Sequence, residues 1–205
     1  MRRSTAFIVA TAVAAVFAAA PLAVSAEPAL VIPPPAHEAP DQTAGLETAV
    51  LAGGCFWGMQ AVYQHVKGVT DAVSGYAGGA RKDAFYETVS TGTTGNAESV
   101  QVTFDPKQIS YGKILQIYFS VAHNPTELDY QGPDHGPQYR SEIFPQSEAQ
   151  AKTARAYIAQ LDAAHVFPRP IVTKTGTMKA AFYPAEAYHQ NYAFLHPMQP
   201  YIAYN

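Results

Sequence analysis

The stretch that decides the fold is Glu47-Thr48-Ala49-Val50-Leu51-Ala52-Gly53-Gly54-Cys55-Phe56-Trp57-Gly58, which contains the single cysteine of the 205-residue sequence. Residues 47–52 have the apolar character of a short buried strand, and the glycine pair that follows permits a tight turn. Beyond the turn, apolar residues recur with helical spacing at Met59, Val62, Tyr63 and Val66. The sequence therefore predicts a strand over 47–52 and a helix over 56–66.

Cys55 is expected in the first turn of this helix. Free backbone N–H groups and the positive end of the helix dipole would stabilise a thiolate there, and the thiolate is the nucleophilic form of cysteine. A lone cysteine is more often a small buried hydrophobe. Glycines on one side and two aromatic residues on the other favour the nucleophile in this chain.

The N-terminal residues are typical of a transport signal. Arg2 and Arg3 precede an apolar run over 6–24, which closes with the small residues of Val24-Ser25-Ala26. A transmembrane anchor is the competing interpretation, but the alanine-rich run and the proline-rich stretch after it favour cleavage near Ala26. We therefore expect residues 1–26 to be a signal peptide and the mature protein to be exported to the periplasm.

Residues 27–46 contain prolines at positions 28, 33, 34, 35 and 40 and show no usable periodicity. This composition is typical of an extended linker that does not pack. Residues 47–205 are numerous enough for one domain with a substantial core. A net charge of −3 with 13 basic residues provides no basic stripe for nucleic acid and no cationic patch for a membrane.

Periodicity along residues 47–205 predicts both helices and strands. We expect strands over 47–52, 69–76, 98–104, 140–144 and 171–174, and helices over 56–66, 111–121, 147–165 and near 185–191, with Ser147 as a helix cap. Along the chain, the first six of these elements follow the order strand, helix, strand, strand, helix, strand, which matches the split β-α-β unit. The predicted fold is α+β, a ferredoxin-like two-layer α/β sandwich followed by a long irregular C-terminal segment.

Two polar loops, over 92–98 and 129–140, have the composition of segments that carry sites. Taken singly, Glu98 fits a solvated strand end, and Tyr86 and Tyr139 fit half-buried packing aromatics. The Asp134-His135 and Tyr188-His189 pairs lack the spacing of a preorganised metal site, so we expect no metal.

Several separated motifs, taken together, resemble the A-type peptide methionine sulfoxide reductases. The resemblance extends from about residue 48 to the C-terminus in the order of the family. The motifs are Gly53-Gly54-Cys55-Phe56-Trp57-Gly58, Gly75-Tyr76-Ala77-Gly78-Gly79, Gly95-Asn96-Ala97-Glu98, Val102-Thr103-Phe104-Asp105-Pro106, Asp134-His135-Gly136-Pro137-Gln138-Tyr139-Arg140-Ser141 and Tyr183-Pro184-Ala185-Glu186-Ala187-Tyr188-His189-Gln190-Asn191-Tyr192.

The resemblance implies reduction of the S epimer of methionine sulfoxide, free or in oxidised proteins, without metal or organic cofactor. We expect the protein to be a monomer. Cys55 would attack the sulfoxide sulfur and become a sulfenic acid, and Glu98 would donate a proton to the sulfoxide oxygen. The other residues carried over are Tyr86 and Tyr139, which would hold that oxygen, Phe56 and Trp57, which would form the methyl slot, and Asp134, which would support the loop.

Two departures from the family pattern bear on the mechanism. Many members carry further cysteines near the C-terminus, whereas this sequence has one cysteine, so a thioredoxin-like protein or another external thiol would regenerate Cys55. Asn96 stands where many relatives have histidine.

Two other classes of protein remain open at this stage. A cysteine hydrolase or acyl-transfer enzyme would pair Cys55 with His189 or His135. A non-catalytic exported binding module would use an aromatic groove and keep Cys55 buried. Neither explains the two tyrosines and the Phe56-Trp57 pair as well as sulfoxide reduction does.

Overall fold

The structure is a computed structural model that describes residues 29–38 and 45–204. The predicted signal peptide lies outside the described residues. Within the described part, six strands form one mixed sheet in the order β7-β6-β1-β3-β2-β8. They are β1 Glu47–Ala52, β2 Val69–Ala77, β3 Ala97–Phe104, β6 Glu142–Phe144, β7 Lys174–Thr175 and β8 Phe182–Pro184. All neighbouring pairs are antiparallel except β6 and β7, which are parallel.

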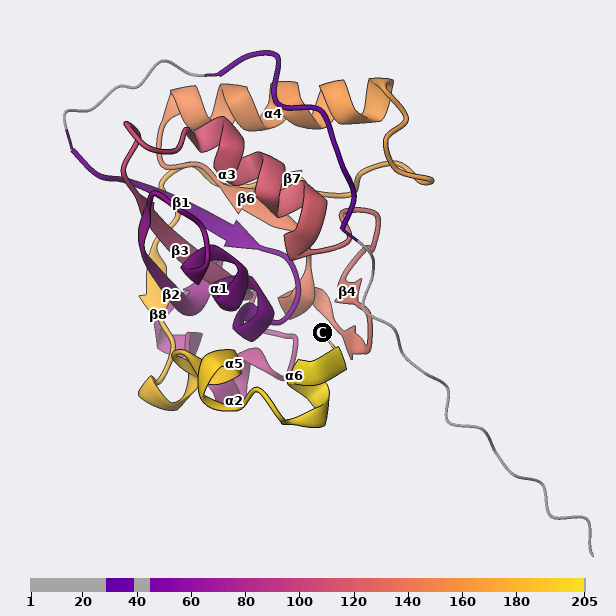
Figure 1. Cartoon of the computed structure of the whole chain (residues 1–205). Coiled ribbons are helices and arrows are strands. Elements are labelled where there is room, and N and C mark those ends of the chain that lie inside the picture. The colour runs from indigo at the N-terminus through magenta and orange to yellow at the C-terminus, as the bar shows by residue number, and fades with distance from the viewer. Residues whose placement is uncertain (1–28, 39–44, 205) are drawn as a thin grey trace, which may run out of the picture.

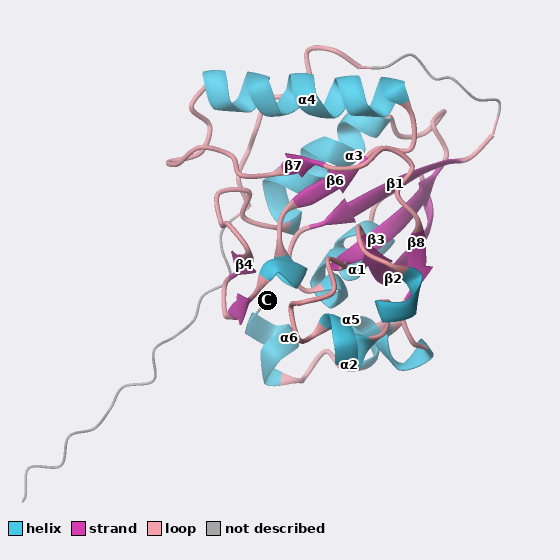
Figure 2. Ribbon diagram, turned by 180° about the vertical axis from the view of Figure 1, so that it is seen from behind, coloured by secondary structure: helices cyan, strands magenta, loops and turns pink. Residues whose placement is uncertain are grey.

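Three longer helices cover one face of the sheet (Figures 1 and 2). They are α1 Phe56–Gln64, α3 Tyr111–Ile117 and α4 Glu148–Ala163, and α3 continues into one π-helical turn over Tyr118–Ala122. Ser147 caps α4, because its hydroxyl accepts the amide proton of Gln150 at 3.1 Å. The α+β class and the Ser147 cap are confirmed.

The remaining helices, and the strands after α4, are short. Near the lower end of the sheet in Figure 1 lie α2 Tyr86–Val89, α5 Tyr192–Leu195 and α6 Pro200–Tyr204, together with the 3₁₀ turn Ala187–His189. The predicted strand over 171–174 is wrong in position, because β7 covers Lys174–Thr175 instead. The predicted helix near 185–191 is likewise a 3₁₀ turn followed by α5, and β8 was not expected.

The main core lies between the sheet and its three covering helices. Alternation along β1 explains this placement, because Ala49 and Leu51 point into the main core whereas Val50 and Ala52 join a smaller cluster on the opposite face. Phe144 from β6 completes the smaller cluster, and Phe182 packs against it. Both faces of β1 are therefore buried.

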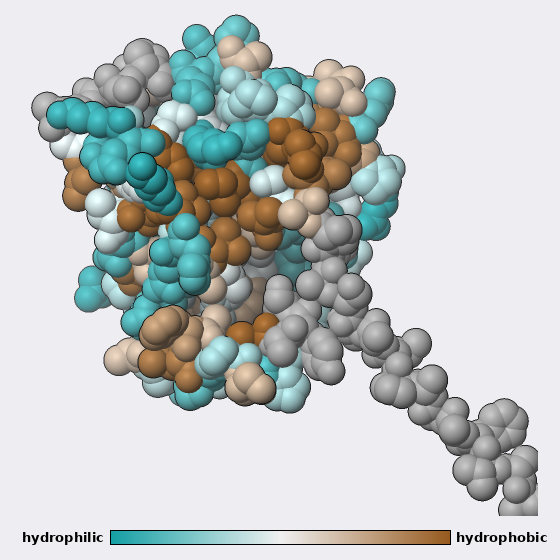
Figure 3. All heavy atoms as spheres, viewed as in Figure 1, coloured by the Kyte–Doolittle hydropathy of each residue, from teal (hydrophilic) through white to brown (hydrophobic). Residues whose placement is uncertain are grey.

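Residues 29–38, called here the N-terminal strap, correct the expectation of an unpacked linker. The strap is extended, but Ile32 is only 4% exposed within the main core, and Pro33 accepts a 2.6 Å hydrogen bond from the Tyr157 hydroxyl of α4. The physical reason is burial of an apolar side chain that sequence periodicity does not reveal. Figure 3 shows apolar residues gathered on this face, over α3 and the strap.

No helix among the described residues is long and apolar enough to span a bilayer. The position of β3 between β1 and β2 brings the chain turns at the ends of these strands together. These turns carry the candidate site.

Candidate active site

The turn between β1 and α1 positions Cys55 at the N-cap of the helix, one residue before the first helical turn. Gly54 has φ of 89°, a conformation that L side chains rarely adopt, and a Cβ at this position would lie 2.7 Å from the Gln131 side chain. The hydroxyl of Tyr118, in the π-helical turn, donates to the Ala52 carbonyl at 2.6 Å. The backbone before Cys55 is therefore held on both sides.

A pocket of about 140 Å³ opens beside Cys55. It is lined by Cys55, Phe56, Trp57, Tyr86, Glu98, Asp134, Tyr139 and Tyr201. All seven residues singled out from the sequence therefore meet in one place, although they come from six separate elements or turns. An apolar wall and several polar groups that converge on one thiol are typical of a small-substrate site.

Glu98 is the second residue of β3 and is 3% exposed. The Phe56 amide donates to its Oε2 atom at 3.1 Å, which favours the ionised carboxylate. Burial acts more strongly in the opposite direction, and the negative charge of Asp134 adds to it, so the pKa of Glu98 rises to about 8. Glu98 therefore holds a proton at neutral pH.

The acidity of Cys55 differs from the sequence expectation of a stabilised thiolate. Burial, and after it the negative charge of Glu98, raises the pKa of the Cys55 thiol to about 12. A hydrogen bond with the Tyr201 side chain and one with the Trp57 backbone lower it only in part. The prediction was wrong because Cys55 caps the helix from a desolvated pocket that contains carboxyl groups from other elements.

Phe56 and Trp57 form the apolar wall. Phe56 is 1% exposed, and its ring centroid lies 5.8 Å from that of Tyr76 in β2. The Trp57 ring is partly exposed and stacks on Tyr192 of α5, with centroids 3.7 Å apart and an angle of 10° between the planes. The wall is thus built by α1 and closed by the C-terminal segment.

Tyr201 in α6 is the pocket residue that the sequence reasoning missed. Its hydroxyl donates to Oδ2 of Asp134, at the start of the two-residue strand β5 Asp134–His135, which pairs with β4 Tyr130–Gln131. Burial raises the pKa of Asp134, whereas the Tyr201 bond lowers it. The aromatic richness of the last twenty residues was the one available signal.

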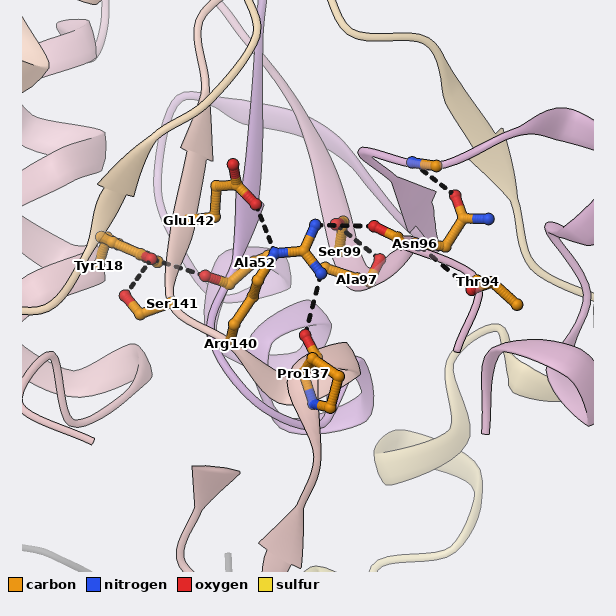
Figure 4. A network of polar contacts seen from close by, with 12 residues as sticks. Ala52, Thr94, Asn96, Ala97, Ser99, Tyr118, Pro137, Arg140, Ser141 and Glu142 are labelled. Carbon is orange, nitrogen blue, oxygen red and sulfur yellow. Dashed lines mark hydrogen bonds and ion pairs between the residues drawn. The ribbon is translucent and has the colours of Figure 1, made fainter. Parts of the chain in front are cut away.

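Arg140 connects the turn before Glu98 to the turn that contains Tyr139. Figure 4 shows the polar contacts of its side chain. Its guanidinium donates to the carbonyls of Gly95 and Pro137 at 2.9 Å each and pairs with Glu142 at 2.5 Å. Gly95 precedes Glu98 in the chain, and Pro137 begins the 3₁₀ turn that ends at Tyr139. One planar fork therefore fixes the Glu98 turn relative to the Tyr139 turn.

Asn96, the residue that departs from the family pattern, braces the neighbouring loop. Its Oδ1 atom accepts from the Gly79 amide at 3.1 Å, and its Nδ2 atom donates to the Ala80 carbonyl at 3.2 Å. The side chain therefore acts on the loop after β2, and within the described part of the chain it forms no hydrogen bond with Glu98.

The alternatives to sulfoxide chemistry receive no support from this geometry. Neither His135 nor His189 lines the pocket, and Nδ1 of His189 accepts a hydrogen bond from the Trp57 indole, so no Cys–His pair forms around Cys55. Cys55 itself is a partly exposed pocket residue rather than a fully buried one. Within residues 29–38 and 45–204, no group of three or more His, Cys, Asp or Glu side chains could hold a metal ion.

Comparison with known proteins agrees with the site. A family model described as peptide methionine sulfoxide reductase matches residues 47–205. Peptide methionine sulfoxide reductase MsrA 2 of Mesorhizobium japonicum is 62% identical over 161 residues, which cover 78% of this chain and 82% of that protein. The corresponding MsrA of Polynucleobacter asymbioticus is 52% identical over 158 residues, covering 77% of this chain and 82% of its own length.

Solved structures also resemble this chain. The reduced form of Mxr1 from Saccharomyces cerevisiae has a TM-score of 0.69 at 33% identity and covers 77% of this chain and 90% of its own. Methionine sulfoxide reductase A of Corynebacterium diphtheriae has a TM-score of 0.65 at 32% identity and covers 84% and 86%. The chain belongs to the peptide methionine sulfoxide reductase family. Within that family it is a one-cysteine, A-type enzyme, a peptide-methionine (S)-S-oxide reductase.

Proposed function

We propose that Cys55 attacks the sulfur of methionine sulfoxide and finishes as a sulfenic acid. In the net step the sulfoxide S–O bond breaks, the oxygen passes to the Cys55 sulfur, and the thiol proton remains as the proton of the S–OH group. Cys55 loses two electrons and the substrate sulfur gains them, so methionine is released without an outside oxidant or reductant. The observation that carries this proposal is the position of Cys55 and a protonated Glu98 in one pocket.

Glu98 acts as the general acid. A sulfoxide oxygen becomes more basic as its bond to sulfur breaks, and a neutral carboxyl at neutral pH can donate a proton to it. The hydroxyls of Tyr86 and Tyr139 supply further hydrogen bonds to the same oxygen. Both tyrosines line the pocket, and burial and the neighbouring carboxylates raise the pKa of Tyr139, so its hydroxyl keeps its proton.

Phe56 and Trp57 bind the methyl group of the substrate, because their rings form the apolar side of the pocket. Asp134 supports the loop between β4 and the Tyr139 turn through its bond from Tyr201. These assignments also suggest the stereochemical choice. The methyl group, the oxygen and the stem that leads out of the pocket give three fixed directions, so only one epimer presents its sulfur to Cys55 in the reactive orientation.

Regeneration of Cys55 requires a thiol from outside the pocket, because the sequence has one cysteine. A single small thiol would form a mixed disulfide and then need a second thiol to release it. A thioredoxin-like dithiol protein performs both steps with its own cysteine pair. We propose such a protein as the partner.

The sequence supports export of this enzyme. The apolar run after Arg2 and Arg3 has the composition of a signal peptide over 1–26, and residues 47–205 form the catalytic domain. The proposed reductant is therefore a thiol protein of the periplasm. We also interpret β6-β1-β3-β2, with α1 and α3 on one face, as the ferredoxin-like unit. Cell fractionation and N-terminal sequencing of the mature protein test the export and the cleavage site.

The reaction is tested by steady-state reduction of a peptide that contains one methionine sulfoxide, in separate S and R epimers, with dithiothreitol as reductant. We expect turnover of the S epimer alone. Tyr86→Phe combined with Tyr139→Phe should slow that turnover while leaving Cys55 able to react with a small alkylating agent. Equal turnover of the two epimers would contradict the proposed pocket.

A further inference from the structure

The single tryptophan of the chain is held by a buried histidine behind the pocket. Nε1 of Trp57 donates to Nδ1 of His189 at 3.1 Å. His189 ends the 3₁₀ turn Ala187–His189 and is 2% exposed. It does not line the pocket, yet its ring centroid lies 4.6 Å from that of Tyr86 and 5.0 Å from that of Phe56. His189 therefore supports three pocket residues from behind.

The bond from Trp57 fixes the tautomer of His189. A neutral imidazole has one N–H, and because Nδ1 accepts the hydrogen bond from the Trp57 indole, that N–H is on Nε2. Nε2 has no hydrogen-bond partner among the residues that the structure describes, and it faces Oε2 of Glu186 at 3.8 Å. Glu186 in turn accepts from the Tyr86 amide and from the Tyr76 hydroxyl, at 3.0 Å each.

We propose that neutral His189 is the positioning residue that holds Trp57 against the substrate methyl group, and that protonation of His189 releases Trp57 and weakens capture of the sulfoxide. An imidazolium carries N–H groups on both ring nitrogens, so protonated Nδ1 would face the indole N–H donor to donor. The new proton on Nδ1 would break the bond that orients Trp57. The proposal rests on the role of Trp57 proposed above.

The surroundings of His189 determine where it titrates. The charged and titratable groups that face it are Glu186 and Tyr188 of its own segment, Tyr86 and Glu87 of α2, and Tyr76 of β2 through Glu186. Burial lowers the pKa of His189, and the charges of Glu186 and Glu87 oppose this effect in part. His189 is therefore neutral at pH 7, and the release of Trp57 belongs to acidic conditions.

Trp57 fluorescence gives a direct readout, because the emission reports one residue. The experiment records emission of the reduced protein from pH 8 to pH 4.5, with circular dichroism at each pH to confirm the fold. In parallel, single-turnover methionine release gives the sulfoxide concentration for half-maximal rate. We expect the Trp57 emission and the half-maximal sulfoxide concentration to follow one titration curve with a midpoint below pH 6.5. The half-maximal sulfoxide concentration should rise roughly 3–10-fold at acid pH, the loss expected for one hydrogen bond.

Two variants separate positioning from packing. In His189→Asn the amide oxygen takes the place of Nδ1 and cannot titrate, so we expect parent-like capture at neutral pH and no pH response. In His189→Gln the amide lies at the place of Nε2 and the acceptor for Trp57 is lost. The half-maximal sulfoxide concentration should then be raised roughly 3–10-fold at every pH, with the maximal rate changed far less.

The proposal is overturned if Trp57 emission of the parent does not titrate, or if the same titration persists in His189→Asn. These two results stand even if His189→Gln does not fold. Trp57→Ala tests separately whether Trp57 binds the substrate methyl group. If this variant captures sulfoxide like the parent, Trp57 does not have that role. The fluorescence titration of the parent still decides whether protonation of His189 releases the indole.

Discussion

The amide of Phe56 donates to Oε2 of Glu98 at 3.1 Å, so the first residue of α1 is bonded to the buried carboxyl of β3. The same turn that positions the nucleophile therefore positions the acid. The bond accounts for one oxygen of the carboxyl and leaves the other free to carry the proton. Burial, which raises the pKa of Glu98 to about 8, keeps that proton in place at neutral pH.

Glu98→Gln should separate the reactivity of Cys55 from catalysis. Loss of the acid should slow methionine release by roughly 10²–10⁴-fold. Alkylation of Cys55 by iodoacetamide at pH 9 should instead become faster, because the ionised Glu98 that raises the Cys55 pKa is gone. Near pH 6.5 the parent's Glu98 is already protonated, so the two proteins should alkylate at similar rates. Equal alkylation rates at pH 9 would remove Glu98 from the electrostatics of Cys55.

The same substitution should stabilise the protein at alkaline pH. Glu98 keeps its proton up to about pH 8 when folded but only up to about 4.5, its ordinary value, when unfolded. Between these pH values the folded state binds the extra proton, so the parent loses stability as pH rises. The free energy of unfolding of Glu98→Gln should exceed that of the parent by up to roughly 4 kcal/mol above pH 8, and the gap should close toward pH 4.5. Urea titrations at several pH values measure it, and a gap that grows toward acid pH would contradict this sign.

Arg140→Ala should impair the reductase step without exposing the core. Without the guanidinium, the Glu98 and Tyr139 turns lose their common anchor, and a small displacement of the acid or the tyrosine should slow sulfenic acid formation roughly 10–100-fold. Added guanidinium ion should restore part of the rate. Arg155→Ala, at an exposed position of α4, is the matched control. A folded Arg140→Ala protein with the parent's rate would show that the anchor does not matter for catalysis.

The N-terminal strap should contribute stability but not chemistry. Ile32→Ala removes a side chain that is 4% exposed, and we expect the free energy of unfolding to drop by about 2 kcal/mol. Val31→Ala changes a neighbour that is 99% exposed and should have an effect below about 0.5 kcal/mol. Methionine release by both variants at a temperature where they are folded should match the parent. Equal stability of the two variants would mean that the strap does not stay packed in solution.

Local patterns explain why much of the fold was predictable. The alternation of β1, the helical spacing after Cys55 and the serine cap of α4 are all properties of neighbouring residues. Separated motifs that match one family led to the same seven pocket residues. Each of these patterns and motifs spans only a few neighbouring residues, so the sequence alone reveals it.

The features that escaped prediction depend on long-range contacts. Tyr201 reaches the pocket only because the C-terminal segment folds back on α1, and no local pattern marks it. Ile32 lies beside three prolines, and this proline-rich stretch has no periodicity that would predict burial of Ile32 in the core. The helix N-terminus at Cys55 was visible in the sequence, but its desolvation and the proximity of Glu98 from β3 were not.

The central claim is that Cys55 takes the oxygen of the sulfoxide and remains a sulfenic acid until an external thiol reduces it. The most direct measurement is single-turnover stoichiometry of the reduced protein with the S epimer and no added reductant, followed by mass analysis after trapping with dimedone. We predict one methionine per protein, a dimedone adduct on Cys55, and no release from Cys55→Ser. Two methionines per protein before arrest, or a Cys55–Cys55 dimer that forms as fast as methionine is released, would contradict the account.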